Sequence, residues 1–177
     1  MYKRQQQGKY YVPQRAAAGL DPWATPQAYD NAKDFFDTGI TWSNSLNVAQ
    51  MLDKSSYSIS LGNTHQDGII SSTGMDRYNV KVSADTKLTN NWSSGFTANY
   101  ITTSIDKAVT SGNGLLRTVY AAPPSYDLAG IPSHVDGNPY TQNSFRGSFD
   151  NAYWAMDNNK FTEDTNRFFG NVYASYQ

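Results

Sequence analysis

The sequence predicts an all-β fold: an antiparallel β-meander of about five strands with one short N-terminal helix and one long loop. Three observations predict it. Polar and apolar residues alternate with a period of two in several segments, as in strands with one apolar face. Short polar turns join these segments in pairs. The 177 residues include thirteen Tyr, four Trp and eight Phe but few aliphatic residues, so the predicted apolar surface is only one layer deep.

The clearest pattern is a hairpin that runs from Met75 to Ile101. In its first strand the apolar positions are Tyr78, Val80, Val82 and Ala84, and the polar positions are Arg77, Asn79, Lys81, Ser83 and Asp85. After a turn at residues 88–91, the apolar positions are Trp92, Phe96, Ala98 and Tyr100, and the others are Ser93, Gly95, Thr97 and Asn99. The two strands therefore share one apolar face and one strongly polar face.

The N-terminal segment, residues 1–36, is predicted to be irregular and truncated. Thr25 as N-cap and Pro26 at the first helical position predict a short helix that ends near Phe36. The basic residues at the very start are not followed by an apolar stretch, so they do not form a signal peptide. Because the last residues also stop within a predicted strand, we expect the chain to be a gene fragment.

Residues 37–177 are predicted to carry the strands. A second hairpin has Ile40, Trp42, Leu46, Val48, Tyr57, Ile59 and Leu61 on its apolar face, with Asn44 as the one polar residue there. The segment 104–165 holds several prolines without regular patterning and is predicted to be a long loop. Alternation returns at Arg167, where Phe169 and Tyr173 interrupt the polar face.

The order of connections (short, longer, short, very long) predicts a partial segment of a large transmembrane β-barrel, whose periplasmic turns are short and extracellular loops long. The predicted strands approach the roughly 9–11 residues that cross a bilayer, whereas no apolar run approaches the roughly 20 of a transmembrane helix. The predicted lipid-facing residues are Tyr78, Val80, Val82, Trp92, Phe96 and Tyr100. The predicted lumen-facing residues are Arg77, Asn79, Lys81, Asp85 and Asn99.

Two candidate functional sites in the sequence each have two possible interpretations. The charged residues of the hairpin could line a lumen, or form the ordinary solvated face of an antiparallel sheet. In the long loop, the candidate substrate-binding residues are Tyr120, Tyr126, Tyr140, Tyr153 and Trp154. Aromatic rings beside amides suit sugar recognition, because rings stack on sugar faces and amides bind hydroxyls. The same rings could equally pack the loop against itself.

Other functional classes find no support in the sequence. Fourteen Lys and Arg against fifteen Asp and Glu give a net charge of −1, which offers no electrostatic case for nucleic acid. There is no cysteine, and His65 and His134 are too far apart in sequence to suggest a metal or catalytic pair. No phosphate-binding loop or nucleophile motif is present. We therefore expect no catalytic residues, metal, cofactor or nucleic-acid partner.

Several short segments resemble the SusC/RagA family of TonB-dependent outer-membrane transporters. They are residues 34–39 (DFFDTG), 56–62 (SYSISLG), 67–70 (DGII), 77–79 (RYN), 151–154 (NAYW) and 167–172 (RFFGNV). The resemblance implies part of a 22-stranded, plugged barrel in the outer membrane of a Gram-negative cell. It also implies import of large nutrients such as glycans or peptides, with a SusD-like lipoprotein lid and the TonB complex as partners.

The alternative is a secreted or cell-surface β-sandwich module that binds carbohydrate through the aromatic loop. A sandwich covers the face of Tyr78, Val80 and Val82 with a second sheet, whereas a barrel segment leaves this face bare as a contiguous apolar band. The burial of this face therefore distinguishes the two hypotheses.

Overall fold

The computed structural model describes residues 5–6, 8–108 and 114–176. The basic residues at the start of the chain, Lys3 and Arg4, lie outside the described residues. The chain divides into two compact units. We call them the sheet unit (Gly39–Gly68, Thr73–Asp106 and Thr162–Gln177) and the mixed unit (Met1–Thr38, Ile69–Ser72 and Lys107–Phe161).

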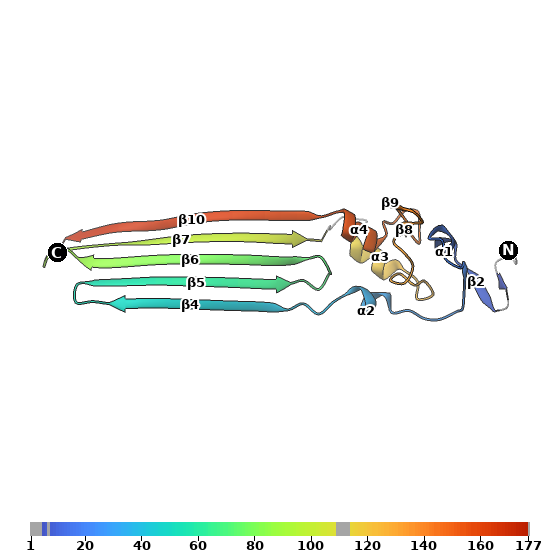
Figure 1. The fold of residues 1–177 in the computed structure, drawn as a ribbon, viewed down its shortest axis with the longest axis horizontal. Helices are drawn as coiled ribbons and strands as arrows, with labels where there is room; N and C mark the ends of the chain where they lie inside the picture. The colour runs from blue at the N-terminus through green and yellow to red at the C-terminus, as the bar shows by residue number, and fades with distance from the viewer. Residues whose placement is uncertain (1–4, 7, 109–113, 177) are drawn as a thin grey trace. The chain divides into compact units, whose positions relative to one another are not determined.

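The sheet unit is built on one antiparallel sheet of five long strands (Figure 1). They are β4 (Thr41–Met51), β5 (Ser55–Asp67), β6 (Gly74–Lys87), β7 (Trp92–Lys107) and β10 (Phe161–Tyr176). Their order in the sheet is β10-β7-β6-β5-β4, so the first four strands form a meander and β10 pairs with β7. A mostly antiparallel β fold is confirmed. Within the described residues the sheet is open, with β4 and β10 at its edges.

The strands are longer than the alternation predicts. β7 continues to Lys107, and β10 begins at Phe161 rather than at Arg167. The added residues are mainly polar on both faces and so lack the alternation by which strands are identified from sequence. They are held by pairing, for example between the Thr162 hydroxyl and the Asp106 carboxylate at 2.6 Å. The connection between these strands is correspondingly shorter than the predicted 104–165.

The mixed unit contains short strands and helices. They are β1 (Gln5–Gln6), β2 (Lys9–Tyr11), α1 (Pro13–Ala17), β3 (Trp23–Ala24), α2 (Asn31–Phe35), α3 (Leu115–Ala121), β8 (His134–Val135), β9 (Asn138–Gln142) and α4 (Ala152–Asn158). The predicted loop is therefore a folded segment, although the prediction for residues 109–113 lies outside the described residues. No helix in the described part of the chain is long and apolar enough to cross a membrane.

The expectation that the chain lacks a packed core is wrong for the mixed unit. Its core combines residues from the N-terminal segment with residues from the predicted loop: Val12, Phe35, Leu115, Val119, Tyr126, Leu128, Ile131, Ala152 and Ala155. The buried Asn31 holds these segments together, because its amide nitrogen donates to the Tyr126 carbonyl at 2.9 Å and its oxygen accepts from the Leu128 amide at 3.1 Å. Contacts this distant in sequence leave no periodic pattern.

The predicted N-terminal helix exists but begins later than expected. α2 starts at Asn31, and Asp30 caps it by accepting a hydrogen bond from the Lys33 amide at 3.2 Å. The Thr25-Pro26 signal is not used, because the Tyr29 amide donates instead to the carbonyl of Pro124 at 2.8 Å. A tertiary hydrogen bond thus outweighs a local capping preference.

Candidate functional site

The register of the sheet separates its two faces. Residues paired across neighbouring strands point to the same side, so each row of partners belongs to one face. One row joins Leu46, Leu61, Val80 and Tyr100. The next residue along each strand belongs to the opposite face. β10 continues the alternation, because the ring of Tyr176 lies 5.2 Å from that of Trp92.

We define the apolar face by the hydrophobic side chains of these rows. Its residues are Trp42, Leu46, Val48, Tyr57, Ile59, Leu61, Tyr78, Val80, Val82, Ala84, Trp92, Phe96, Ala98, Tyr100, Phe168, Val172 and Tyr176. All six residues predicted to face lipid lie on this face. Ile59 is 48% exposed and Val80 is 39% exposed, although both lie on inner strands of the sheet. The described residues of the sheet unit provide no second sheet over this face.

Aromatic residues border the apolar face at both ends. Trp42 and Tyr78 lie towards the ends of β5 and β7, whereas Trp92 and Tyr176 lie at the short turn. Thr102, the partner of Tyr78, follows Trp92 on β7 by ten residue steps. This corresponds to about 34 Å along a strand and, at a tilt of about 40°, to about 26 Å across a bilayer. Between these borders, the row of Tyr78 also contains Asn44, Asn63 and Thr102, and the row of Ser94 contains Ser55 and Thr86, so the most apolar part of the face lies in the rows between them.

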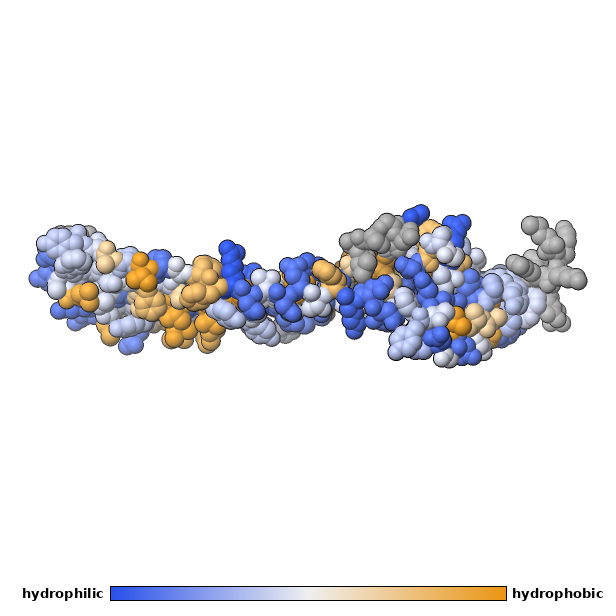
Figure 2. All heavy atoms as spheres, turned by 90° about the horizontal axis from the view of Figure 1, so that it is seen from above, coloured by the Kyte–Doolittle hydropathy of each residue, from blue (hydrophilic) through white to orange (hydrophobic). Residues whose placement is uncertain are grey.

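The same side of the sheet becomes charged from the row of Trp42 onwards, because the partner of Trp42 is His65. His65 lies between two carboxylates, with Nδ1 2.7 Å from Asp76 and Nε2 3.3 Å from Asp67. Asp106 follows on β7. Figure 2 shows hydrophobic side chains over the part of the sheet nearer to the short turns and hydrophilic side chains towards the ends of β5 and β7. The sheet is therefore amphipathic both across its faces and along its strands.

The opposite side, which we call the polar face, holds all five residues predicted to face the lumen: Arg77, Asn79, Lys81, Asp85 and Asn99. Hydroxyl pairs connect neighbouring strands there, including Ser58 with Ser83 at 2.7 Å. The Ser60 hydroxyl also donates to the Asn47 side-chain oxygen at 3.2 Å. The charges of this face thus lie within a network of short polar side chains.

Sequence reasoning missed the role of Tyr173 on the polar face. Its hydroxyl donates to the Asp85 carboxylate at 2.8 Å, across the intervening strand β7. The alternation shows only that Tyr173 interrupts a polar face. Its partner depends on the register between β10 and β7, which sequence does not reveal.

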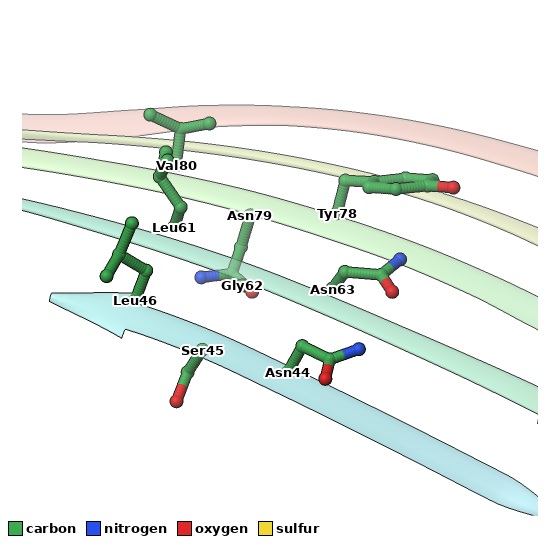
Figure 3. A pocket seen from close by; sticks show the side chains of 9 residues that line it. All are labelled: Asn44, Ser45, Leu46, Leu61, Gly62, Asn63, Tyr78, Asn79 and Val80. Atoms are coloured by element: carbon green, nitrogen blue, oxygen red, sulfur yellow. The ribbon is translucent and has the colours of Figure 1, made fainter.

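An open groove lies on the apolar face at the boundary with the charged end. Figure 3 shows Leu46, Leu61 and Val80 gathered in one part of it, and the amides of Asn44 and Asn63 in the other part with Tyr78. Asn44 and Asn63 are partners on β4 and β5. The alternation in the sequence indicates Asn44, and its continuation past Leu61 by two residues would also have indicated Asn63.

The candidate substrate-binding aromatics fall in the mixed unit and differ in exposure. Tyr126 is buried in the core, and the ring of Tyr153 lies 5.3 Å from that of Phe35. Tyr120 and Tyr140 are 70% and 84% exposed. Trp154 uses its indole nitrogen to donate to the Pro139 carbonyl at 2.9 Å. Two of the five residues are thus widely available to a ligand, and the others pack within the unit.

Burial also changes the acidity of two of these tyrosines. Removal from water raises the pKa of the Tyr126 hydroxyl, and the negative charge of Asp127 adds to the effect. Burial likewise raises the pKa of Tyr153, with a contribution from Asp34. Both phenols therefore stay protonated at neutral pH and can act as hydrogen-bond donors, not as bases.

No protein-family model matches the chain, and no curated protein matches it with significant similarity. Within the described residues, no three His, Asp or Glu side chains form a group that could hold a metal ion.

Proposed function

We propose that the sheet unit is a segment of an outer-membrane β-barrel that belongs to a TonB-dependent nutrient transporter of the SusC/RagA type. The observation that carries the proposal is the apolar face: it is exposed, and the aromatic residues at its two ends lie about 34 Å apart along the strands, or about 26 Å apart when the strands tilt. An exposed hydrophobic surface of this extent needs an apolar partner, and lipid has the matching thickness.

The open edges of the sheet support a larger barrel. β4 and β10 contain 11 and 16 residues, and each has one neighbouring strand within the described residues. Open sheet edges are not tolerated in a bilayer, because each unpaired backbone group there costs several kcal/mol. The proposal therefore requires further strands on both sides of this sheet, contributed by a longer gene product.

The transporter class rests on the segments that resemble the SusC/RagA family. In this proposal the polar face, with Arg77, Lys81 and Asp85, lines the lumen, and the exposed Tyr120 and Tyr140 belong to an extracellular segment that contacts glycans or peptides. A lipoprotein lid and the TonB complex act on the complete protein. The carbohydrate-binding sandwich needs a second sheet over the apolar face, and no observation on the described residues favours it.

Sequencing the gene beyond both ends tests the transporter class. We expect a plug domain upstream and many amphipathic hairpins downstream. A reading frame that closes without further strands would contradict the proposal.

Two neighbouring substitutions test the orientation of the sheet in the complete protein. Val82→Arg lies in the middle row of the apolar face and should destabilise the membrane-inserted barrel by about 2–4 kcal/mol. Ser83→Arg, on the polar face, is the matched control and should cost far less. Guanidinium unfolding of the protein in lipid vesicles measures both, and equal costs would contradict the proposed orientation.

A further inference from the structure

Three basic side chains lie in the middle of the polar face: Arg77 and Lys81 on β6, and Arg167 on β10. We call these three residues the basic patch. Arg77 and Lys81 are four residues apart on one strand, which corresponds to about 14 Å. All three side chains are exposed.

Contacts on both sides of Arg167 place it on the polar face. The Tyr173 hydroxyl donates to Asp85 on the polar face, whereas Tyr100, on the apolar face, donates to the Asn166 side chain at 3.1 Å. Odd-numbered residues of β10 between these contacts therefore lie on the polar side. Because β7 lies between β10 and β6, Arg167 is two strand spacings, about 10 Å, from β6.

Arg167 is also level with the other two basic residues. Its neighbour Asn166 contacts Tyr100, and the residue after Tyr100 is Ile101, the partner of Asn79. Asn79 lies midway between the other two basic residues on β6. The three basic residues are thus within about 14 Å of one another along the backbone.

Uncharged side chains surround the basic patch. The partners of Arg77 and Lys81 on β5 and β7 are Thr64, Thr103, Ser60 and Asn99. Within the described residues, none of the three basic side chains forms an ion pair with a carboxylate. Along these strands the polar face carries Asp85 and Glu163, each four residues, or about 14 Å, from the basic patch. The middle of the polar face therefore keeps three positive charges.

A lumen wall with this charge attracts anions. In the orientation proposed above, the polar face borders an aqueous lumen within a wall of low dielectric constant, and such a geometry concentrates the field of the charges. Arg and Lys side chains line anion-selective pores for the same reason. A guanidinium group also binds a carboxylate through two parallel hydrogen bonds. The basic patch thus favours an anionic cargo over a neutral one.

The other side chains near the basic patch favour a saccharide. The Phe169 ring is 46% exposed and lies 5.3 Å from the guanidinium of Arg167. The amides of Asn79 and Asn99 lie on the same face. Aromatic rings stack on sugar faces, and amides bind sugar hydroxyls. An extended peptide is instead typically bound along a sheet edge, with pockets for its side chains.

From these observations we propose that the basic patch binds the carboxylates of an acidic oligosaccharide. Arg77, Lys81 and Arg167 pair with carboxylates of different sugar units, and the Phe169 ring stacks on one sugar. This inference rests on the transporter function proposed above, and it names acidic glycans as the cargo among the glycans and peptides of that proposal.

Calorimetry with two probes that differ only in charge tests the inference. Trigalacturonate carries three carboxylates, and its methyl ester has the same sugar units without the charge. The complete protein in detergent micelles should bind trigalacturonate about three- to thirtyfold more tightly than the ester, as two or three exposed ion pairs would give. The preference should decrease as the salt concentration rises.

Arg77→Gln combined with Lys81→Gln should remove most of this preference and leave the binding of the ester unchanged. Lys54→Gln combined with Lys87→Gln is the matched control, because it removes the same charge at the short-turn end of the sheet; it should keep the preference. Arg77→Lys combined with Lys81→Arg retains both charges and should keep it too.

An acetylated and amidated peptide of three glutamates carries the same charge as trigalacturonate and should bind more weakly. Equal or tighter binding of this peptide would overturn the saccharide cargo. No binding of trigalacturonate, equal binding of its ester, or a preference that survives in the variant without Arg77 and Lys81 would overturn the basic patch as an anion site.

Cysteine labelling separates these outcomes from a failure of the transporter proposal. Thr97 and Ala98 lie on opposite faces, because their partners on β6 are Ser83 and Val82. In vesicles, a charged thiol reagent should label Thr97→Cys from the aqueous lumen and leave Ala98→Cys unlabelled in the lipid. Equal labelling would overturn the membrane orientation, and the cargo with it. The expected labelling without a charge preference would overturn the basic patch alone.

Discussion

The hydroxyl of Tyr173 on β10 donates a hydrogen bond to the carboxylate of Asp85 on β6, although strand β7 lies between them. The contact is possible because Gly95 occupies the intervening position on β7. A Cβ atom at Gly95 would lie 2.6 Å from Cε1 of Tyr173 and closer still to the Asp85 carboxylate. Because glycine has no side chain at position 95, a hydrogen bond can connect β10 to β6 across β7 on the polar face.

Gly95→Ala should therefore destabilise the sheet unit, although alanine usually suits a strand better than glycine. The new methyl group would also approach the Ala84 carbonyl at 2.9 Å, and such overpacking costs about 1–3 kcal/mol. Gly147→Ala is the control, because a Cβ there meets no atom within 4 Å. Denaturant unfolding of both variants measures the costs. Equal free energies of unfolding would show that the strands adjust without loss.

Asn31→Ala should destabilise the mixed unit by about 2–4 kcal/mol, because it leaves the buried Leu128 amide and Tyr126 carbonyl without their partner. Asn158→Ala is the control, because the Asn158 side chain is exposed and donates only to the Trp154 carbonyl. It should change the stability by less than about 0.5 kcal/mol. Urea unfolding followed by tryptophan fluorescence tests both. A cost below about 1 kcal/mol for Asn31→Ala would contradict the proposed role of this amide.

Tyr126→Phe should stabilise the mixed unit at neutral pH by about 0.5–2 kcal/mol. The Tyr126 hydroxyl is buried and has no hydrogen-bond partner among the described residues, so its removal relieves a desolvation cost. Urea titration of both proteins near neutral pH measures this difference. A destabilised variant would indicate that the hydroxyl has a partner.

The same variant should change the response to alkali. Because the folded pKa of Tyr126 is raised above the unfolded value of about 10, the native protein keeps its full stability below about pH 10 and loses it as the pH rises towards the folded pKa. Tyr126→Phe should lose less stability over this window. Unfolding at about pH 8 and about pH 11 measures the difference, and parallel losses would show that Tyr126 ionises normally when folded.

Tyr140→Ala should separate sugar recognition from packing in the mixed unit. Tyr140 is exposed, so its truncation should change the free energy of unfolding by less than about 0.5 kcal/mol. Tyr153→Ala should cost about 1–3 kcal/mol, because it removes the ring that packs on Phe35. We expect calorimetry with neutral oligosaccharides to show weaker binding for Tyr140→Ala. Unchanged binding would remove Tyr140 from the substrate surface.

The alternation of residues predicted the strands of the sheet unit, because this alternation can be read within each strand by itself. Tyr78, Val80 and Val82 alternate with Arg77, Asn79 and Lys81, and a strand of period two places them on opposite faces whatever surrounds it. The short turn at residues 88–91 fixes the hairpin register in the same way. The strand ends near Lys107 and Phe161 were missed, because polar residues on both faces carry no alternation.

The mixed unit could not be predicted in this way. Its core joins Val12 and Phe35 to Leu115, Leu128 and other residues far along the chain, and such contacts leave no periodic signal.

The sequence by itself determined the two faces of the sheet, because alternation alone assigns each side chain to a side. Only the tertiary structure decided which side chains meet across strands, such as Tyr173 with Asp85 and Asn44 with Asn63. The physical reason is that pairing depends on register and on close approach at glycine, which are properties of several strands together and not of any one segment.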